Sequence, residues 1–130
     1  MALYLGSNKV AGNLVSNDTG WIDLALNSGV SAVTSKYRKV DNIVTVVITN
    51  LTGYTLDAVF ATLPESIRPK YGFRCLCATT GTSMARLEVY NNNGDPGDGS
   101  THSDRKGAML IFNNTSGSNA WVDINITYSV

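Results

Sequence analysis

The sequence predicts an all-β protein, an antiparallel β-sandwich of seven to eight strands with a jelly-roll-like arrangement. Three observations lead to this fold class. Apolar and polar residues alternate with a period of two in several segments, which is the spacing of a strand with one buried face. Clusters of Gly, Asn, Asp and Ser separate these segments at short intervals, as in sandwiches and barrels. No segment combines sustained helical spacing with helix caps.

The clearest local pattern is a β-hairpin over residues 36–49, with Asp41 and Asn42 in its two-residue turn. Both residue types tolerate the positive φ that tight hairpin turns need. One face of the second arm is entirely apolar, and we expect it to lie in the core. The residues on that face are Val44, Val46 and Ile48.

The same alternation predicts six further strands. They cover residues 21–26, 55–62, 71–79, 84–90, 108–112 and 120–130. In the strand at 84–90, one set of side chains would face the core and the other would face outward. The inward set is Ala85, Leu87 and Val89, and the outward set is Arg86, Glu88 and Tyr90.

Residues 63–69 carry proline at positions 64 and 69. Because proline cannot donate to a central ladder, this segment is predicted to be a loop or crossover between strands. We expect Arg68 within it to be a structural anchor that bonds loop carbonyls.

The length of 130 residues and the hydrophobic content of 43% indicate one folded domain. We place this single β-sandwich domain at residues 20–130 and interpret residues 1–19 as an N-terminal arm or linker. No apolar run reaches the roughly 18 residues that a membrane span needs, so no membrane insertion is expected. The first residues show no signal peptide, which predicts synthesis in a cytoplasm without export by that route.

The charge balance argues against a nucleic-acid partner. Ten Lys and Arg residues offset ten Asp and Glu residues, and no basic stripe is present. Neutralising phosphates supplies most of the affinity for nucleic acids, so this class is not expected. Asn, Thr, Ser and Gly supply the polarity instead, and they suit hydrogen bonding to neutral ligands such as sugars.

Cys75 and Cys77 are predicted to be buried free thiols. Residues i and i+2 share one face of a strand, and such neighbours rarely meet disulfide geometry. Two thiols without His or further Cys do not make a zinc site, and no cofactor is expected.

Two aromatic residues, Tyr90 and Trp121, fall at outward positions of strands whose inner rows are apolar. Three interpretations remain open: a subunit interface, ordinary packing under a loop, or stacking against a ligand ring. A ligand would be a saccharide whose hydroxyls bond nearby polar groups. The expected ligand-binding residues are Tyr90, Asn92, Asp95, Asp98, His102 and Trp121.

Residues 91–107 form the longest polar interruption and contain the single histidine, His102. Their composition favours a solvated loop, and sugar or partner contact is a second interpretation. A third places a hard cation among Asp95, Asp98 and Asp104, without the ligand spacing of an EF-hand. One histidine in a polar loop, with no Gly-x-Ser-x-Gly elbow, predicts no catalytic residue and no enzymatic activity.

Three short motifs follow one another in a characteristic order. They are Trp21-Ile22-Asp23-Leu24, then Tyr37-Arg38-Lys39-Val40-Asp41-Asn42-Ile43-Val44, then Ala61-Thr62-Leu63-Pro64-Glu65-Ser66-Ile67-Arg68-Pro69. This order resembles the small β-rich modules at the ends of bacteriophage tail-fibre and baseplate receptor-binding proteins, over residues 3–75. The resemblance implies a homotrimeric sandwich or jelly-roll head in a virion tail or baseplate. It also implies contact with other tail proteins and binding of a host-surface saccharide or protein.

The matched motifs are interpreted as scaffold, and host-specific loops would lie beyond residue 80. Two other functions stay open. One is a non-catalytic virion scaffold or decoration protein that only oligomerises. The other is an envelope-degrading hydrolase, in which His102 or the pair Asp95 and Asp98 would act. A cellular lectin or adhesin would share the physics of sugar binding, but the missing signal peptide argues against it.

Overall fold

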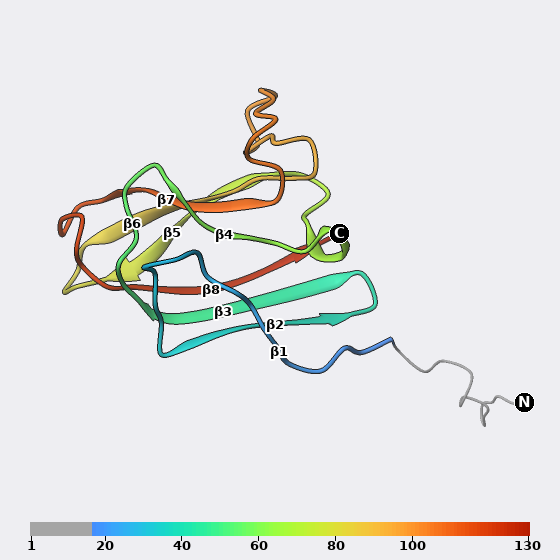
Figure 1. The fold of residues 1–130 in the computed structure, drawn as a ribbon, viewed down its shortest axis with the longest axis horizontal. Helices are drawn as coiled ribbons and strands as arrows, with labels where there is room; N and C mark the ends of the chain where they lie inside the picture. The colour runs from blue at the N-terminus through green and yellow to red at the C-terminus, as the bar shows by residue number, and fades with distance from the viewer. Residues whose placement is uncertain (1–16) are drawn as a thin grey trace, which may run out of the picture.

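The computed structural model describes residues 17–130, which form one antiparallel sheet of eight strands (Figure 1). The strands are β1 (Ile22–Asp23), β2 (Thr34–Val40), β3 (Ile43–Leu51), β4 (Val59–Thr62), β5 (Phe73–Thr79), β6 (Met84–Val89), β7 (Ala108–Asn114) and β8 (Val122–Ser129). Hydrogen bonds join them in the order β1-β2-β3-β8-β5-β6-β7-β4. The all-β antiparallel class and a count of eight strands are therefore confirmed.

The predicted hairpin is present as β2 and β3. Its turn residue Asp41 has φ 54°, as the two-residue turn requires. The apolar face of β3 is fully buried, with Val44, Val46 and Ile48 all at 0% exposure. The period-two alternation in this stretch thus identified the core face correctly.

The sheet consists of two four-stranded halves, β1-β2-β3-β8 and β5-β6-β7-β4. The halves meet where Ala78 and Thr79 of β5 pair with Asp123 and Val122 of β8. Apolar side chains from both halves form one buried cluster, so the sheet curls around a shared core (Figure 1). Hydrogen bonding runs through a single sheet, and the division into two packed sheets that defines a sandwich remains a prediction.

Residues 24–27 run between the two outer edges of the curled sheet. Leu24 N donates to Ser35 O of β2 at 2.9 Å, and Asn27 N donates to Phe60 O of β4 at 2.8 Å. The Asn27 side chain also donates to Val59 O at 2.9 Å. The strand predicted at 21–26 is therefore shorter than expected, at Ile22–Asp23, because the chain leaves β2 after Leu24 to reach β4.

The strand predicted at 55–62 begins later than expected, at Val59. Ala58 N donates to Thr55 O at 3.2 Å, and Asp57 has φ 56°, so residues 55–58 turn instead of extending. In the crossover that follows, Glu65–Ile67 form a short 3₁₀ turn. Arg68 Nε donates to Leu63 O at 2.9 Å, which confirms the expected structural anchor.

The described residues contain no helix with the length and hydropathy that a membrane crossing requires. Of the predicted N-terminal arm, residues 1–16 lie outside the described residues. Asp18, in the remaining part of that arm, forms a β-bridge with Val40.

The strands carry different connections at their two ends. We call one end the loop end, because it holds residues 91–107 together with the hairpin turn at 41–42. We call the other the turn end, because it holds residues 80–83 and 115–121. Figure 1 shows residues 91–107 standing out from the sheet at the loop end, whereas 115–121 lie far from them.

Candidate functional site

The loop of residues 91–107 is organised by its own hydrogen bonds. Asn91 O accepts from Gly94 N at 3.1 Å and from Gly107 N at 3.0 Å, which closes the base of the loop. His102 N donates to Gly94 O at 2.9 Å, and this bond joins the outgoing and returning parts of the loop. A Cβ at Gly94 would lie 1.9 Å from His102 O, so this close approach requires glycine.

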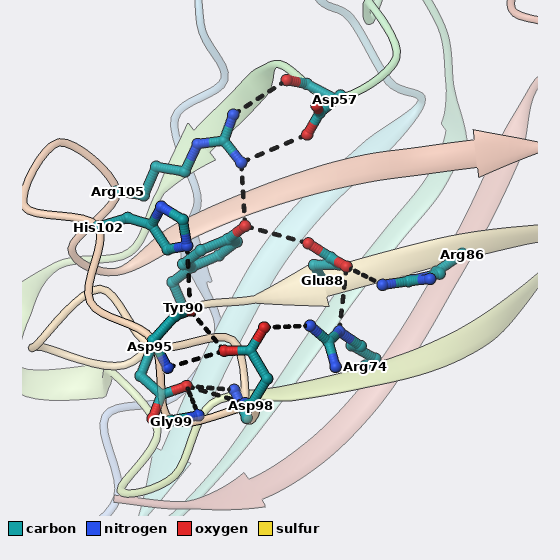
Figure 2. Close-up of polar contacts among 12 residues, drawn as sticks. Asp57, Arg74, Arg86, Glu88, Tyr90, Asp95, Asp98, Gly99, His102 and Arg105 are labelled. Carbon is teal, nitrogen blue, oxygen red and sulfur yellow. Dashed lines mark hydrogen bonds and ion pairs between the residues drawn. The ribbon is translucent and has the colours of Figure 1, made fainter.

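Asp95 organises the tip of the same loop. Its Oδ1 accepts three backbone hydrogen bonds, from the amides of Gly97 at 2.7 Å, Asp98 at 3.0 Å and Gly99 at 3.1 Å. Figure 2 shows these contacts converging on one carboxylate oxygen. This oxygen serves the loop itself, so its first role is structural.

A buried carboxylate, Glu88 of β6, lies beneath the loop on the outward face of the sheet. Its residue exposure is 3%. Oε1 accepts a hydrogen bond from the Tyr90 hydroxyl at 3.0 Å. Oε2 accepts from Arg74 Nε at 3.1 Å and from Arg86 Nη2 at 2.5 Å (Figure 2). Burial of this charge is tolerated because two guanidinium groups and a hydroxyl satisfy it.

The contacts of Glu88 extend into the loop. Arg74 Nη2 donates to Asp98 Oδ2 at 2.8 Å. Arg105 Nη1 donates to the Tyr90 hydroxyl at 3.0 Å and to Asp57 Oδ1 at 3.3 Å. Three arginines thus balance three carboxylates. We call this set the Glu88 network: Asp57, Arg74, Arg86, Glu88, Tyr90, Asp98 and Arg105.

The network also shifts the protonation equilibria of its members. Burial is the main cause that raises the pKa of Tyr90, whose hydroxyl therefore stays protonated and donates to Glu88. The hydrogen bond to Asp98 raises the pKa of Arg74, and the hydrogen bond to Tyr90 raises that of Arg105. Each shift favours the protonation state that the observed contacts need.

Tyr90 is not an exposed aromatic, and its predicted role as an exposed ligand platform is wrong. It does occupy an outward position, but its exposure is only 2%. Ala108, Leu110 and Val59 pack with it, and the Arg105 guanidinium lies 5.7 Å from its ring centroid. Of the three interpretations considered for this side chain, packing under a loop is the correct one.

His102 is half-buried and packs edge-on against Tyr90, with ring centroids 5.7 Å apart. Its Nε2 lies 3.1 Å from Ser100 Oγ, and this hydroxyl donates to Asp98 Oδ1 at 2.5 Å. Since the single serine proton goes to Asp98, His102 Nε2 must be the donor to Ser100. This direction is opposite to the one in which a general base activates a serine nucleophile.

The contacts of Asp98 hold its carboxylate in the ionised form. The Ser100 hydroxyl, followed by the Ser100 amide and Arg74, lowers the pKa of Asp98 to about 2. Asp98 is nevertheless exposed at the surface of the loop. It therefore combines a structural role with access to solvent.

The structure does not assemble the alternative cation site. Within residues 17–130, no group of three or more His, Cys, Asp and Glu side chains is placed to hold a metal ion. Asp95 and Asp98 are engaged by amides, Ser100 and Arg74 instead of facing Asp104. The third interpretation of this loop, a cation held by Asp95, Asp98 and Asp104, is therefore wrong.

Asn92 is exposed, and Arg68 Nη1 donates to its Oδ1 at 2.6 Å. The anchor in the proline-containing crossover thus holds the start of the loop as well.

Searches against models of protein families, curated proteins and solved structures found no match.

The structure separates Trp121 from the other predicted site residues. Tyr90, Asn92, Asp95, Asp98 and His102 belong to the loop end, whereas Trp121 directly precedes β8 at the turn end. Trp121 is half-buried there. The six expected ligand-binding residues therefore occupy two places, the loop end and the start of β8.

Sequence reasoning missed the charged part of the Glu88 network. Arg86 and Glu88 were assigned outward positions, but nothing marked them as buried or paired. The signal in the sequence is a pair of opposite charges at outward positions of consecutive strands, Arg74 and Glu88. In the structure these two residues are partners in the register of β5 and β6. That register was not known from the sequence.

Proposed function

We propose that this chain is the receptor-binding domain of a bacteriophage or prophage tail or baseplate, and that it binds a host cell-surface saccharide without catalysing a reaction. The observation that carries the proposal is the support beneath residues 91–107. A charge-balanced network centred on the buried residues Glu88 and Tyr90 contacts this exposed polar loop through Asp98 and Arg105. Buried polar networks are costly to build, and rigid support of a loop lowers the entropic cost of binding.

The exposed side of the loop has the chemistry that neutral sugars need. Asn93, Thr101 and Ser103 are exposed, and their side chains make no hydrogen bond to other residues of the described chain. Amide and hydroxyl groups donate to and accept from sugar hydroxyls. The loop therefore offers free polar groups above a scaffold in which the Glu88 carboxylate and the Tyr90 hydroxyl are already paired, whereas the buried Nε of Arg86 has no partner.

The proposal places the domain in a homo-oligomer, with a trimer expected, together with other tail proteins in the virion. Exposed apolar side chains on several strands and connections support association, among them Val33 at 77% and Leu76 at 66% exposure. Several linked copies would also compensate for weak single-site sugar binding through avidity.

The test compares two matched triple variants in binding to a glycan array and to envelope fractions of candidate hosts. The loop variant is Asn93→Ala, Thr101→Ala and Ser103→Ala. The control variant is Ser28→Ala, Thr55→Ala and Ser118→Ala, all exposed and outside the loop. We expect the loop variant to lose binding and the control to retain it. Absence of binding by the unmodified oligomer to every glycan and fraction would refute the proposal.

A second function, a virion scaffold that only oligomerises, is favoured by one specific observation. Leu76, Met84 and Phe112 line a hollow of about 420 Å³ on the outward face of β5, β6 and β7. The Arg86 guanidinium lies over the Phe112 ring at 4.3 Å from its centroid, so the Glu88 network borders this hollow. For a scaffold, Leu76→Ser would dissociate the oligomer in sedimentation velocity, while the loop variant would leave host adsorption unchanged.

A further inference from the structure

We propose that Trp121 and Asp123 form a second saccharide subsite, which takes one neutral pyranose ring at the turn end. This inference rests on the proposed function, because it assumes that the ligand is a saccharide. It differs in location, since residues 91–107 lie at the opposite end of the strands.

The site is a hollow of about 340 Å³ on the outward face of β3 and β8. Volumes of this size are at the lower end of those that hold small ligands. Its lining combines an indole, a carboxylate, an amide, a hydroxyl and an aliphatic group. The residues are Trp121, Asp123, Asn50, Thr49 and Val33. An aromatic face beside polar groups matches a sugar ring, which has an apolar face and hydroxyls at its edge.

One carboxylate oxygen of Asp123 accepts a hydrogen bond from the backbone, and the other is available to bind a ligand hydroxyl. Its Oδ1 accepts from Asn50 N at 2.8 Å, and its side chain is exposed. The register between β3 and β8 shifts between Ile48 and Leu51, and Asn50 in this irregularity has φ 58°. Bulges reorient side chains beside binding sites. Here the bulge places the Asn50 amide against Asp123 and so orients the carboxylate.

A buried polar cluster fixes the backbone just before β8. Tyr54 Oη donates to Ala120 O at 2.5 Å, and Thr79 Oγ1 donates to Trp121 O at 2.5 Å. Asn114 Nδ2 donates to both of these hydroxyl oxygens, at 2.9 and 3.1 Å. Thr79 and Asn114 are two of the three buried polar or charged residues in the described chain, and the third is Glu88. Both ends of the molecule thus have buried polar support under a surface segment.

The lining also specifies the charge of the ligand. Asp123 is the single charged residue of the hollow, so an anionic sugar would be repelled and a neutral one accepted. A neighbouring hollow of about 350 Å³ shares Asp123 and continues along the outward face to Asn125. A neutral chain of two or more sugars would therefore contact more of this face than one ring does.

The experiment follows the fluorescence of Trp121 in a Trp21→Phe background, which removes the other tryptophan. The probes are the methyl glycosides of glucose, galactose, mannose and rhamnose, together with N-acetylglucosamine, with glucuronic acid as the anionic comparison. Envelope polysaccharide of the candidate hosts is tested in parallel by pull-down. We expect at least one neutral probe to change the Trp121 emission in a saturable way, and glucuronic acid to have no effect.

Asp123→Asn is the decisive variant, because it preserves shape and an acceptor for the Asn50 amide while it replaces the free carboxylate oxygen. We expect it to weaken the fluorescence titration at least tenfold with an unchanged unfolding midpoint. Trp121→Ala should weaken polysaccharide pull-down relative to the unmodified protein, and circular dichroism checks that the variant folds.

Two results would overturn the subsite and leave the proposed function standing. In the first, polysaccharide binds equally to the Asp123→Asn and Trp121→Ala proteins but is lost in the loop variant. In the second, Trp121→Ala dissociates the oligomer in sedimentation velocity, which would assign this hollow to a contact between copies. Failure of every probe and polysaccharide to bind the unmodified protein would overturn both proposals together.

Discussion

The Tyr90 hydroxyl donates a hydrogen bond to Glu88 Oε1 at 3.0 Å, although both residues occupy outward positions on the sheet. Both are buried because residues 91–107 and their neighbours fold over this end of β6. The hydrogen bond therefore joins the last part of β6 to Tyr90, the residue that directly precedes the loop. Loop order should depend on it.

Glu88→Gln tests this dependence. The variant keeps an acceptor for Tyr90 but removes the charge that two arginines share, so we expect a loss of about 1–3 kcal/mol in unfolding free energy. Hydrogen exchange of the amides in residues 91–107 should accelerate more than that of β3. Glu65→Gln, at the other glutamate of the chain, which is exposed, is the control and should stay within about 0.5 kcal/mol of the unmodified protein. Equal effects of the two substitutions would contradict the assigned role.

A pair of glycine substitutions tests the closure of the loop. Gly94 and Gly99 both have positive φ, at 75° and 83°, so alanine strains either position by about 1 kcal/mol. A Cβ at Gly94 also meets His102 O, whereas one at Gly99 has nothing within 4 Å. Gly94→Ala should therefore lower the free energy of unfolding by a further ~1–3 kcal/mol, as measured by chemical denaturation. The prediction fails if the two variants unfold at the same denaturant concentration.

Acid should weaken the attachment of the loop within a defined pH range. The folded-state pKa of Asp98 is about 2, below its ordinary value of about 3.9. A carboxyl whose pKa is lower in the folded than in the unfolded protein stabilises the fold at pH values above its unfolded-state pKa. This contribution disappears as the pH falls from about 4 through about 2. Asp18 has a similar shift, caused first by its hydrogen bond with Arg38.

The measurement is the thermal midpoint between pH 5 and pH 2 for the unmodified protein, Asp98→Asn and Asp18→Asn. Each variant should start from a lower midpoint and show a shallower decline than the unmodified protein. A slope that is unchanged in both variants would show that other carboxylates control the acid response.

The two cysteines should differ in reactivity. Both are free, as expected, but Cys75 is half-buried and only Cys77 is fully buried. The neighbouring Cys77 thiol lowers the pKa of Cys75, whereas the Cys75 thiol and burial raise the pKa of Cys77. Iodoacetamide should therefore label Cys75 before Cys77 in the folded protein, as read by peptide mass spectrometry. In denaturant the two rates should converge, and equal labelling in the folded state would be inconsistent with this difference.

Some features were predictable because they depend on neighbours in the chain. The hairpin around Asp41 and the buried row of β3 follow from turn chemistry and from alternation over a few residues. The inward row of β6 was identified in the same way. The limits of β1 and β4 were not predictable, because a crossing segment ends one strand and a turn at Asp57 delays the other.

The candidate site shows the same division. The sequence singled out residues 91–107 and the outward position of Tyr90, but it left packing under a loop as one of three interpretations of that side chain. Contacts such as Arg74 with Asp98 and Arg105 with Asp57 join residues far apart in sequence. Their formation depends on strand register and on the path of the loop, and neither is encoded in a short window.

Trp121 gives the clearest contrast. Alternation assigns it to the outward side of its segment, and together with the turn residues it predicts an antiparallel chain of seven to eight strands. Only the three-dimensional arrangement shows that Trp121 lies at the turn end, beside Asp123 and away from His102. The physical reason is that a period of two specifies which face of a strand is apolar. It does not specify which strands become neighbours or which end of the sheet a connection occupies.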